Sequence, residues 1–120
     1  MSLTRRQRSV FAKAMLTWQH KLNLGDWRIC PVRERTDALC QVRVEYADRL
    51  ASWTLNGAAW DQQDSSDRGL EEIACHELLH VLLAELSALA SSPQTVSLEQ
   101  IDAAEHRIIN TLTPLLVPKQ

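Results

Sequence analysis

The stretch DRGLEEIACHELLHVLLAELSALA, residues 67–90, decides the fold, because it predicts one long helix at the centre of the domain. Its middle, residues 78–83, is apolar around most of the helical circumference, so the helix should be buried on several sides. Ser66 or Asp67 can cap its start, and the Ser-Ser-Pro run at residues 91–93 breaks it. The rest of the chain must supply the elements that cover this helix.

Two further helices are predicted, each opened by a capping box, in which a serine or threonine is followed three residues later by glutamine. The first runs over about residues 5–22, and the last over about residues 97–113, just before Pro114. The two capping pairs are Thr4 with Gln7 and Ser97 with Gln100. The central helix is thus expected to lie between an N-terminal and a C-terminal helix.

Three strands are predicted between the first helix and the central one. The clearest is residues 40–46, where apolar and polar residues alternate with the period of two of a half-buried strand. Weaker strands are residues 27–34, where Pro31 indicates an edge position or a bulge, and residues 51–55. We expect a small antiparallel meander and, with the helices, an α+β fold.

Length and composition favour one folded domain over residues 1–120. A chain of 120 residues, 45% hydrophobic and 23% charged, is an ordinary single domain in both size and composition. The net charge of -2 leaves no basic excess for a phosphate backbone, so nucleic acid is not expected as a partner. The longest apolar run, residues 78–84, is interrupted by His80 and is too short for a membrane span.

The cysteines and the N-terminus bear on the compartment. Three cysteines form no CxxC pair and are odd in number, which disfavours a disulfide scaffold. Arg5 and Arg6 faintly resemble a twin-arginine export signal, but Lys13 and His20 interrupt the apolar region that such a signal needs. A cytoplasmic location is therefore expected.

The central helix carries the pattern HExxH at His76, Glu77 and His80. Histidines four residues apart in a helix lie one turn above each other, so both imidazoles can reach one metal ion. Glu77 lies about 100° around the helix, where it can hold and deprotonate a water on that metal. Zinc lowers the pKa of such a water to about 7 and polarises a carbonyl, which is the chemistry of hydrolysis.

The pattern is specific. Roughly 0.009 matches are expected by chance in a chain of this composition. If His76 and His80 were ordinary residues of a buried helix, each would need a separate polar partner. We therefore expect one zinc ion per chain, with Glu77 as the general base.

A catalytic zinc generally takes three protein ligands, and the last helix offers Glu105 as the third. Apolar residues at positions 98, 101, 108 and 112 predict its buried stripe, and Glu105 falls inside that arc at about 40° from Ile101. His106 and Glu99 lie at about 140° and 160°, outside the arc, and are the weaker alternatives. Alternatively, Glu105 pairs with an arginine or lies at the rim of the stripe.

With HELLH at residues 76–80 and a downstream helical Glu105, the chain resembles the glutamate-liganded zincin metallopeptidases, and it is similar to small predicted metallopeptidases of phage and prophage genomes. The resemblance implies a minimal zincin-like core in which an edge strand, here residues 51–56, lies along an extended substrate. The sequence departs from the larger enzymes at Ile109, where they carry an aspartate, and no later histidine is available as a transition-state donor.

The expected function is that of a zinc-dependent metallopeptidase, a hydrolase acting on a peptide or protein substrate. The alternative is a non-catalytic, metal-stabilised regulatory or interaction module, which the small size favours. Among the remaining residues, Tyr46 and Trp60 are expected in the core rather than at the site, and Cys75 is expected to be an inert thiol.

Overall fold

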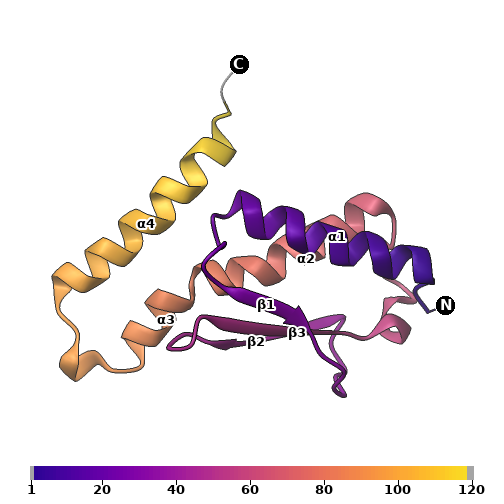
Figure 1. Cartoon of the computed structure of the whole chain (residues 1–120), viewed down its shortest axis with the longest axis horizontal. Helices are drawn as coiled ribbons and strands as arrows, with labels where there is room; N and C mark the ends of the chain where they lie inside the picture. Colours follow the sequence, from indigo (N-terminus) through magenta and orange to yellow (C-terminus); the bar gives the residue numbers. More distant parts are fainter. Residues whose placement is uncertain (1, 119–120) are drawn as a thin grey trace.

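The computed structural model describes residues 2–118 and has an α+β architecture (Figure 1). An N-terminal helix is followed by three strands, and three α-helices complete the chain. The elements are α1 (Arg5–Lys21), β1 (Arg28–Pro31), β2 (Cys40–Glu45), β3 (Leu50–Leu55), the short 3-10 helix η1 (Gly57–Trp60), α2 (Asp67–Leu82), α3 (Ala84–Ala90), the 3-10 helix η2 (Pro93–Thr95) and α4 (Leu98–Leu116).

The three strands form a mixed sheet with the order β1-β3-β2. β2 and β3 are antiparallel neighbours, with Val42 opposite Trp53, but β1 runs parallel to β3, with Arg28 opposite Leu50. The predicted all-antiparallel meander is therefore wrong for β1, because residues 32–39 carry the chain past β3 to the far edge instead of turning back beside β1. β1 ends at Pro31 on an edge of the sheet, as the proline indicates.

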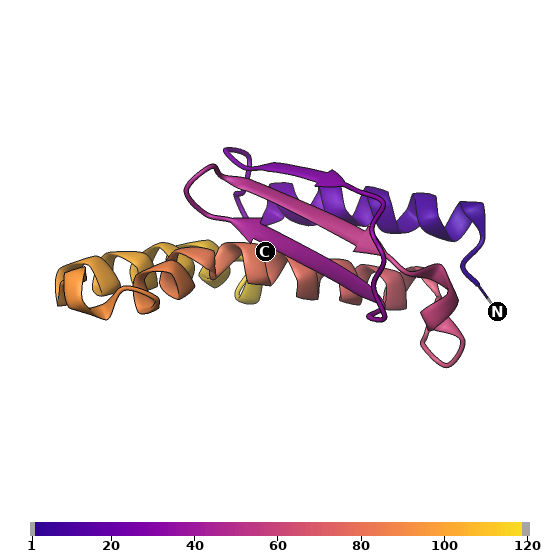
Figure 2. The same ribbon diagram turned by 90° about the horizontal axis from the view of Figure 1, so that it is seen from below.

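α1 and α2 pack together on one face of this sheet, as the two ribbon views agree (Figures 1 and 2). The layer between helices and sheet is aromatic: the ring of Phe11 contacts those of Trp53 and Trp60 edge-on, with centroids 5.3 and 6.3 Å apart. Leu70 and Leu78 on α2 are fully buried in the same core. Trp60 is thus a core residue, as expected.

The predicted central helix is broken into two. α2 ends at Leu82 and α3 begins at Ala84, bent by 43°. The prediction of one long helix over residues 67–90 is wrong here, because α3 lies beyond the end of the sheet (Figure 2) and packs against α4 instead. No single helix among residues 2–118 is long and apolar enough to span a membrane, although the bent pair α2 and α3 together would be.

α4 differs from its prediction in two ways. It begins with the predicted capping box of Ser97 and Gln100, but it continues through Pro114 to Leu116 instead of ending before the proline. A proline in the last turn removes only one helical hydrogen bond, so the helix can run past it. The predicted buried stripe is also wrong at its start, because Leu98 is 74% exposed and Ile101 is exposed as well.

Candidate metal centre

His76 and His80 lie on the solvent side of α2. The opposite side of that helix carries Leu70, Leu78 and Val81, which are buried, and this packing fixes which way the histidines point. Both imidazoles are exposed, and their ring centroids are 5.2 Å apart, one helical turn from each other. The spacing of HExxH therefore produces the juxtaposition that it predicts.

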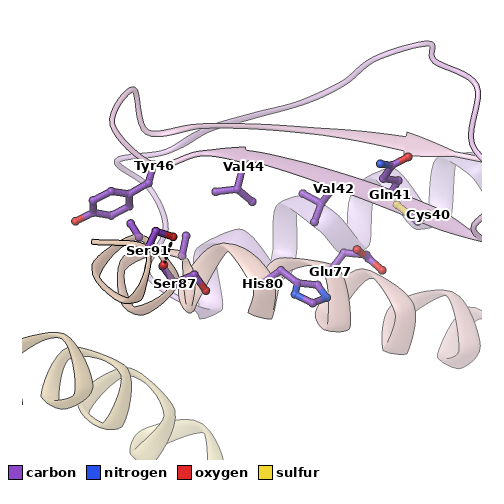
Figure 3. A pocket seen from close by; sticks show the side chains of 11 residues that line it. Cys40, Gln41, Val42, Val44, Tyr46, Glu77, His80, Ser87 and Ser91 are labelled. Atoms are coloured by element: carbon purple, nitrogen blue, oxygen red, sulfur yellow. Dashed lines mark hydrogen bonds between the residues drawn. The ribbon is translucent and has the colours of Figure 1, made fainter. Parts of the chain in front are cut away.

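Glu77 takes a different position, turned from the histidines toward the sheet. It is only 9% exposed, and its side chain lines a cleft of about 600 Å³ that His80 also borders (Figure 3). One wall of this cleft is β2 and the other is the α2–α3 segment, ending at Ser87 and Ser91. The cleft thus brings an exposed imidazole and a largely buried carboxylate to the same opening.

Burial raises the pKa of the Glu77 carboxyl above its ordinary value, because the charged form loses hydration. His76 and His80 act in the opposite direction and lower that pKa, since their positive forms favour the carboxylate. A carboxylate with a raised pKa holds a proton more readily than an exposed one does. That is the property required of a general base working near neutral pH.

The strand beside the site is β2. The predicted edge strand, residues 51–56, is wrong, because β3 is the central strand and is paired on both sides. β2 is paired only with β3 in the described sheet, so its outer edge presents backbone groups next to the cleft. The alternation of residues 40–46 correctly predicted a half-buried strand, but alternation does not indicate which strand lies at the edge of the sheet.

Cys40 is a member of the cleft lining that sequence reasoning did not assign to the site. It is buried at the end of the cleft occupied by Glu77 (Figure 3), and its thiol pKa is raised to about 12. Burial is the main cause, the negative charge of Glu77 adds to it, and a hydrogen bond with the backbone of Thr54 opposes it. A thiol with this pKa stays neutral and leaves Glu77 as the ionisable group at that end.

Tyr46 lies at the other end of the cleft. Its ring packs against the core, with the guanidinium of Arg49 4.9 Å from its centroid, so the expected packing role is confirmed. The phenol donates a 3.1 Å hydrogen bond to Oε2 of Glu85, a residue that is also ion-paired with Arg107 of α4. The hydroxyl is thus engaged away from His80 (Figure 3).

The third predicted ligand is not brought to the histidines. Glu105 is exposed on α4, and the prediction that it faces the metal helix from a buried arc is wrong in this arrangement. α4 instead borders a groove lined by Val81 and Leu82, about 100° and 200° around α2 from His80. His106 and Glu99 are exposed as well. Among residues 2–118, no three His, Cys, Asp or Glu side chains form a metal-binding group.

The side chains at this site provide part of the ligand set that zinc needs. Two imidazoles on one helix face are a pair of nitrogen ligands that a zinc ion accepts, and the neighbouring carboxylate of Glu77 lies in the wall of the cleft. A third protein ligand is missing from the described part of one chain. The assignment of Glu105 as that ligand stays a prediction, which this position of α4 does not by itself support.

None of the family models, curated proteins or solved structures compared with the chain matches it. The resemblance to zincins accordingly rests on HELLH at residues 76–80 and on the chemistry of the residues around it.

Proposed function

We propose that the protein is a zinc-dependent hydrolase of peptide bonds, a metallopeptidase with a zincin-like core. The observation that carries the proposal is the cleft shared by His80 and Glu77, with His76 one turn away on the exposed face of α2. An exposed pair of nitrogen donors beside a largely buried carboxylate is unusual for a purely structural helix, where each buried charge needs a compensating partner.

Each residue has a separate task in this proposal. His76 and His80 hold the metal through their neutral rings, and zinc bound there would supply a Lewis acid and a nucleophile at neutral pH. Glu77 accepts a proton from the attacking water on a carboxylate oxygen and returns it to the leaving amine. Its burial in the cleft wall raises the pKa toward the value that this exchange needs.

The free edge of β2 supports an extended peptide as the substrate. A strand edge offers backbone donors and acceptors to a second strand, and here it forms one wall of the cleft. Val42 and Val44 line the same wall, so the substrate side chains would meet an apolar surface. A strand edge pairs with an extended segment, so an unfolded stretch of protein fits this wall better than a compact domain does.

The test compares Glu77→Gln with the wild type in zinc content and in cleavage of a denatured protein. The substitution keeps the size of the side chain and removes the base, so zinc content should stay the same while activity falls by about 100-fold or more. Glu72→Gln is the matched control, because Glu72 is exposed on the same helix and pairs only with Arg68 among the contacts described. Equal loss in both variants, or no loss in Glu77→Gln, would contradict the assignment.

A non-catalytic, metal-stabilised module is the second candidate, and the lack of a third ligand within the described chain favours it. In that case zinc would raise the Tm of the wild type and of Glu77→Gln equally, and neither protein would cleave any substrate. His76→Ala should abolish the zinc effect in either case.

A further inference from the structure

The two ends of the cleft between β2 and the α2–α3 segment differ in chemistry. Glu77 and His80 are the acidic and basic side chains of its described lining, and both lie away from Tyr46 (Figure 3). At the other end the hydroxyl of Ser91 donates to the backbone oxygen of Ser87, and that of Tyr46 is bound away from the cleft. We call this the neutral end and define it by Val44, Tyr46, Ala84, Ser87, Ala88 and Ser91.

The helix wall of the neutral end is made of small side chains. Ala84 and Ala88 lie one turn apart on α3, and neither extends beyond a methyl group. Val44 lies on the face of β2 that packs against the core, yet it stays partly exposed, because these small side chains leave the cleft open beside it. An apolar group that entered the neutral end would therefore cover surface that the protein leaves in water.

Glu77 gives a second, independent sign that a molecule binds in this cleft. Its side chain is 9% exposed, yet within residues 2–118 its carboxylate has no hydrogen bond or salt bridge. A carboxylate held in this way lacks the compensation that buried charges normally have. The neutral end opens into the same cleft, so an extended molecule that binds at Glu77 can occupy both ends.

The free edge of β2 determines how a peptide would lie in the cleft. Along this strand Val42 comes first and Val44 follows, further from Glu77 and nearer to Tyr46 (Figure 3). Successive side chains of a strand point to opposite faces, so a peptide paired with β2 directs every second side chain toward the helices. The side chain that enters the neutral end therefore belongs to the peptide residue two positions from the one beside Val42.

We infer that the neutral end is a specificity subsite for an uncharged, bulky apolar side chain of the substrate, and that Ala88 sets the size it admits. The inference rests on the proposed function, because it names a feature of the peptide that the site cleaves. A charged side chain would lose its hydration there without an opposite charge to replace it, whereas a leucine or phenylalanine side chain would gain burial. Ala84 is already buried in the core, but Ala88 is partly exposed, so a larger side chain at position 88 can extend into the cleft.

The first experiment maps cleavage sites in a denatured protein by mass spectrometry, with the zinc-loaded wild type. The best-cleaved sequence is then synthesised as a peptide with phenylalanine, leucine, alanine, glutamate or lysine at each position in turn. At one position within about three residues of the cleaved bond, phenylalanine or leucine should give a kcat/KM about 10-fold or more above that of alanine. Glutamate and lysine at that position should be cleaved more slowly than alanine.

The variant Ala88→Leu tests whether the subsite is the neutral end. It should lower kcat/KM for the phenylalanine peptide by about 10-fold or more and leave that for the alanine peptide within about 2-fold. Ser87→Leu, at an exposed position of the same lining, is a second variant that leaves the core untouched and should act in the same direction. Ala90→Leu is the control, because Ala90 is exposed on α3 and is not part of the described lining.

The ratio of the two peptides distinguishes a failure of the inference from a failure of the proposed function. An unchanged ratio in both Ala88→Leu and Ser87→Leu, with zinc-dependent cleavage retained, would overturn the inference and leave the proposed function standing. A wild type that prefers a charged residue at that position, or shows no preference at any position, would do the same. No zinc-dependent cleavage of any peptide by the wild type would overturn both.

Discussion

α2 and α4 are both amphipathic helices, but the structure covers them to very different extents. α2 packs beside α1 on one face of the sheet, and its residues Leu70, Ala74 and Leu78 have no exposed surface. α4 runs apart from the sheet (Figure 1), and only Ala104 among its described side chains is buried. α2 is therefore covered along much of its length, whereas α4 keeps several apolar side chains in solvent.

The largest expected effect is the difference in stability between substituting a buried leucine of α2 and an exposed isoleucine of α4. Leu78→Ala should lower the free energy of unfolding by about 3 kcal/mol, because it removes fully buried atoms and leaves a cavity. Ile109→Ala should change it by less than about 0.5 kcal/mol, because the side chain is already exposed. Urea unfolding of the metal-free protein measures both. Similar losses for the two variants would mean that α4 is covered in solution.

A smaller effect concerns the loss of hydration that the Glu77 carboxylate suffers when α2 folds into place. Glu77→Gln should stabilise the metal-free protein by about 1 kcal/mol at neutral pH, because it replaces a carboxylate that loses hydration on folding. The folded-state pKa is raised above the ordinary value of 4.5, so the folded protein binds the proton more tightly than the unfolded chain does.

The sign of the pH dependence follows from that shift. As pH rises from 4.5 through the raised pKa, the unfolded chain releases its proton first and the folded state loses stability. The difference in Tm between Glu77→Gln and the wild type should be largest at neutral pH and shrink on acidification. A difference that grew toward low pH would contradict the burial of this carboxylate.

The smallest effect is expected at the contact that holds α4. Arg107→Met removes the ion pair with Glu85 and should cost less than about 1 kcal/mol, since Arg107 is largely exposed. The substitution should nevertheless increase the rate of amide hydrogen exchange more in α4 than in α2, because this ion pair is one of few contacts that fix α4. Unchanged exchange in α4 would show that Leu112 and Leu115 suffice to hold it.

What the sequence predicted well is local. The capping boxes at Thr4 and Ser97 and the spacing of His76 and His80 depend on residues three or four apart, and all are present. The pairing of β1 and the bend after Leu82 depend on distant neighbours, and both were predicted wrongly. Local chemistry is encoded in the spacing, whereas the choice of neighbours is made by the whole fold.

Glu105 shows the same difference between local prediction and the choice of neighbours at the candidate site. Helical phase correctly groups it with the apolar residues of α4, since Ile101 and Ile109 lie one turn before and after it. Phase does not say which part of an apolar arc is covered, and only the flank with Ala104 is. The helical phase of Glu105 was therefore predicted correctly, but not whether that side of α4 is covered.

The short connection between β2 and β3 has a consequence for how the chain folds. Residues 46–49 join two antiparallel strands that are neighbours both in sequence and in the sheet, so this hairpin can form alone within about 1–10 μs. β1 is expected to pair later than this hairpin forms, because Leu50, the partner of Arg28, lies 22 residues further along the chain. The contact between α1 and α2 closes an even longer loop. The strand that borders the cleft is therefore expected to be among the first parts formed, before the helix that carries the histidines has docked.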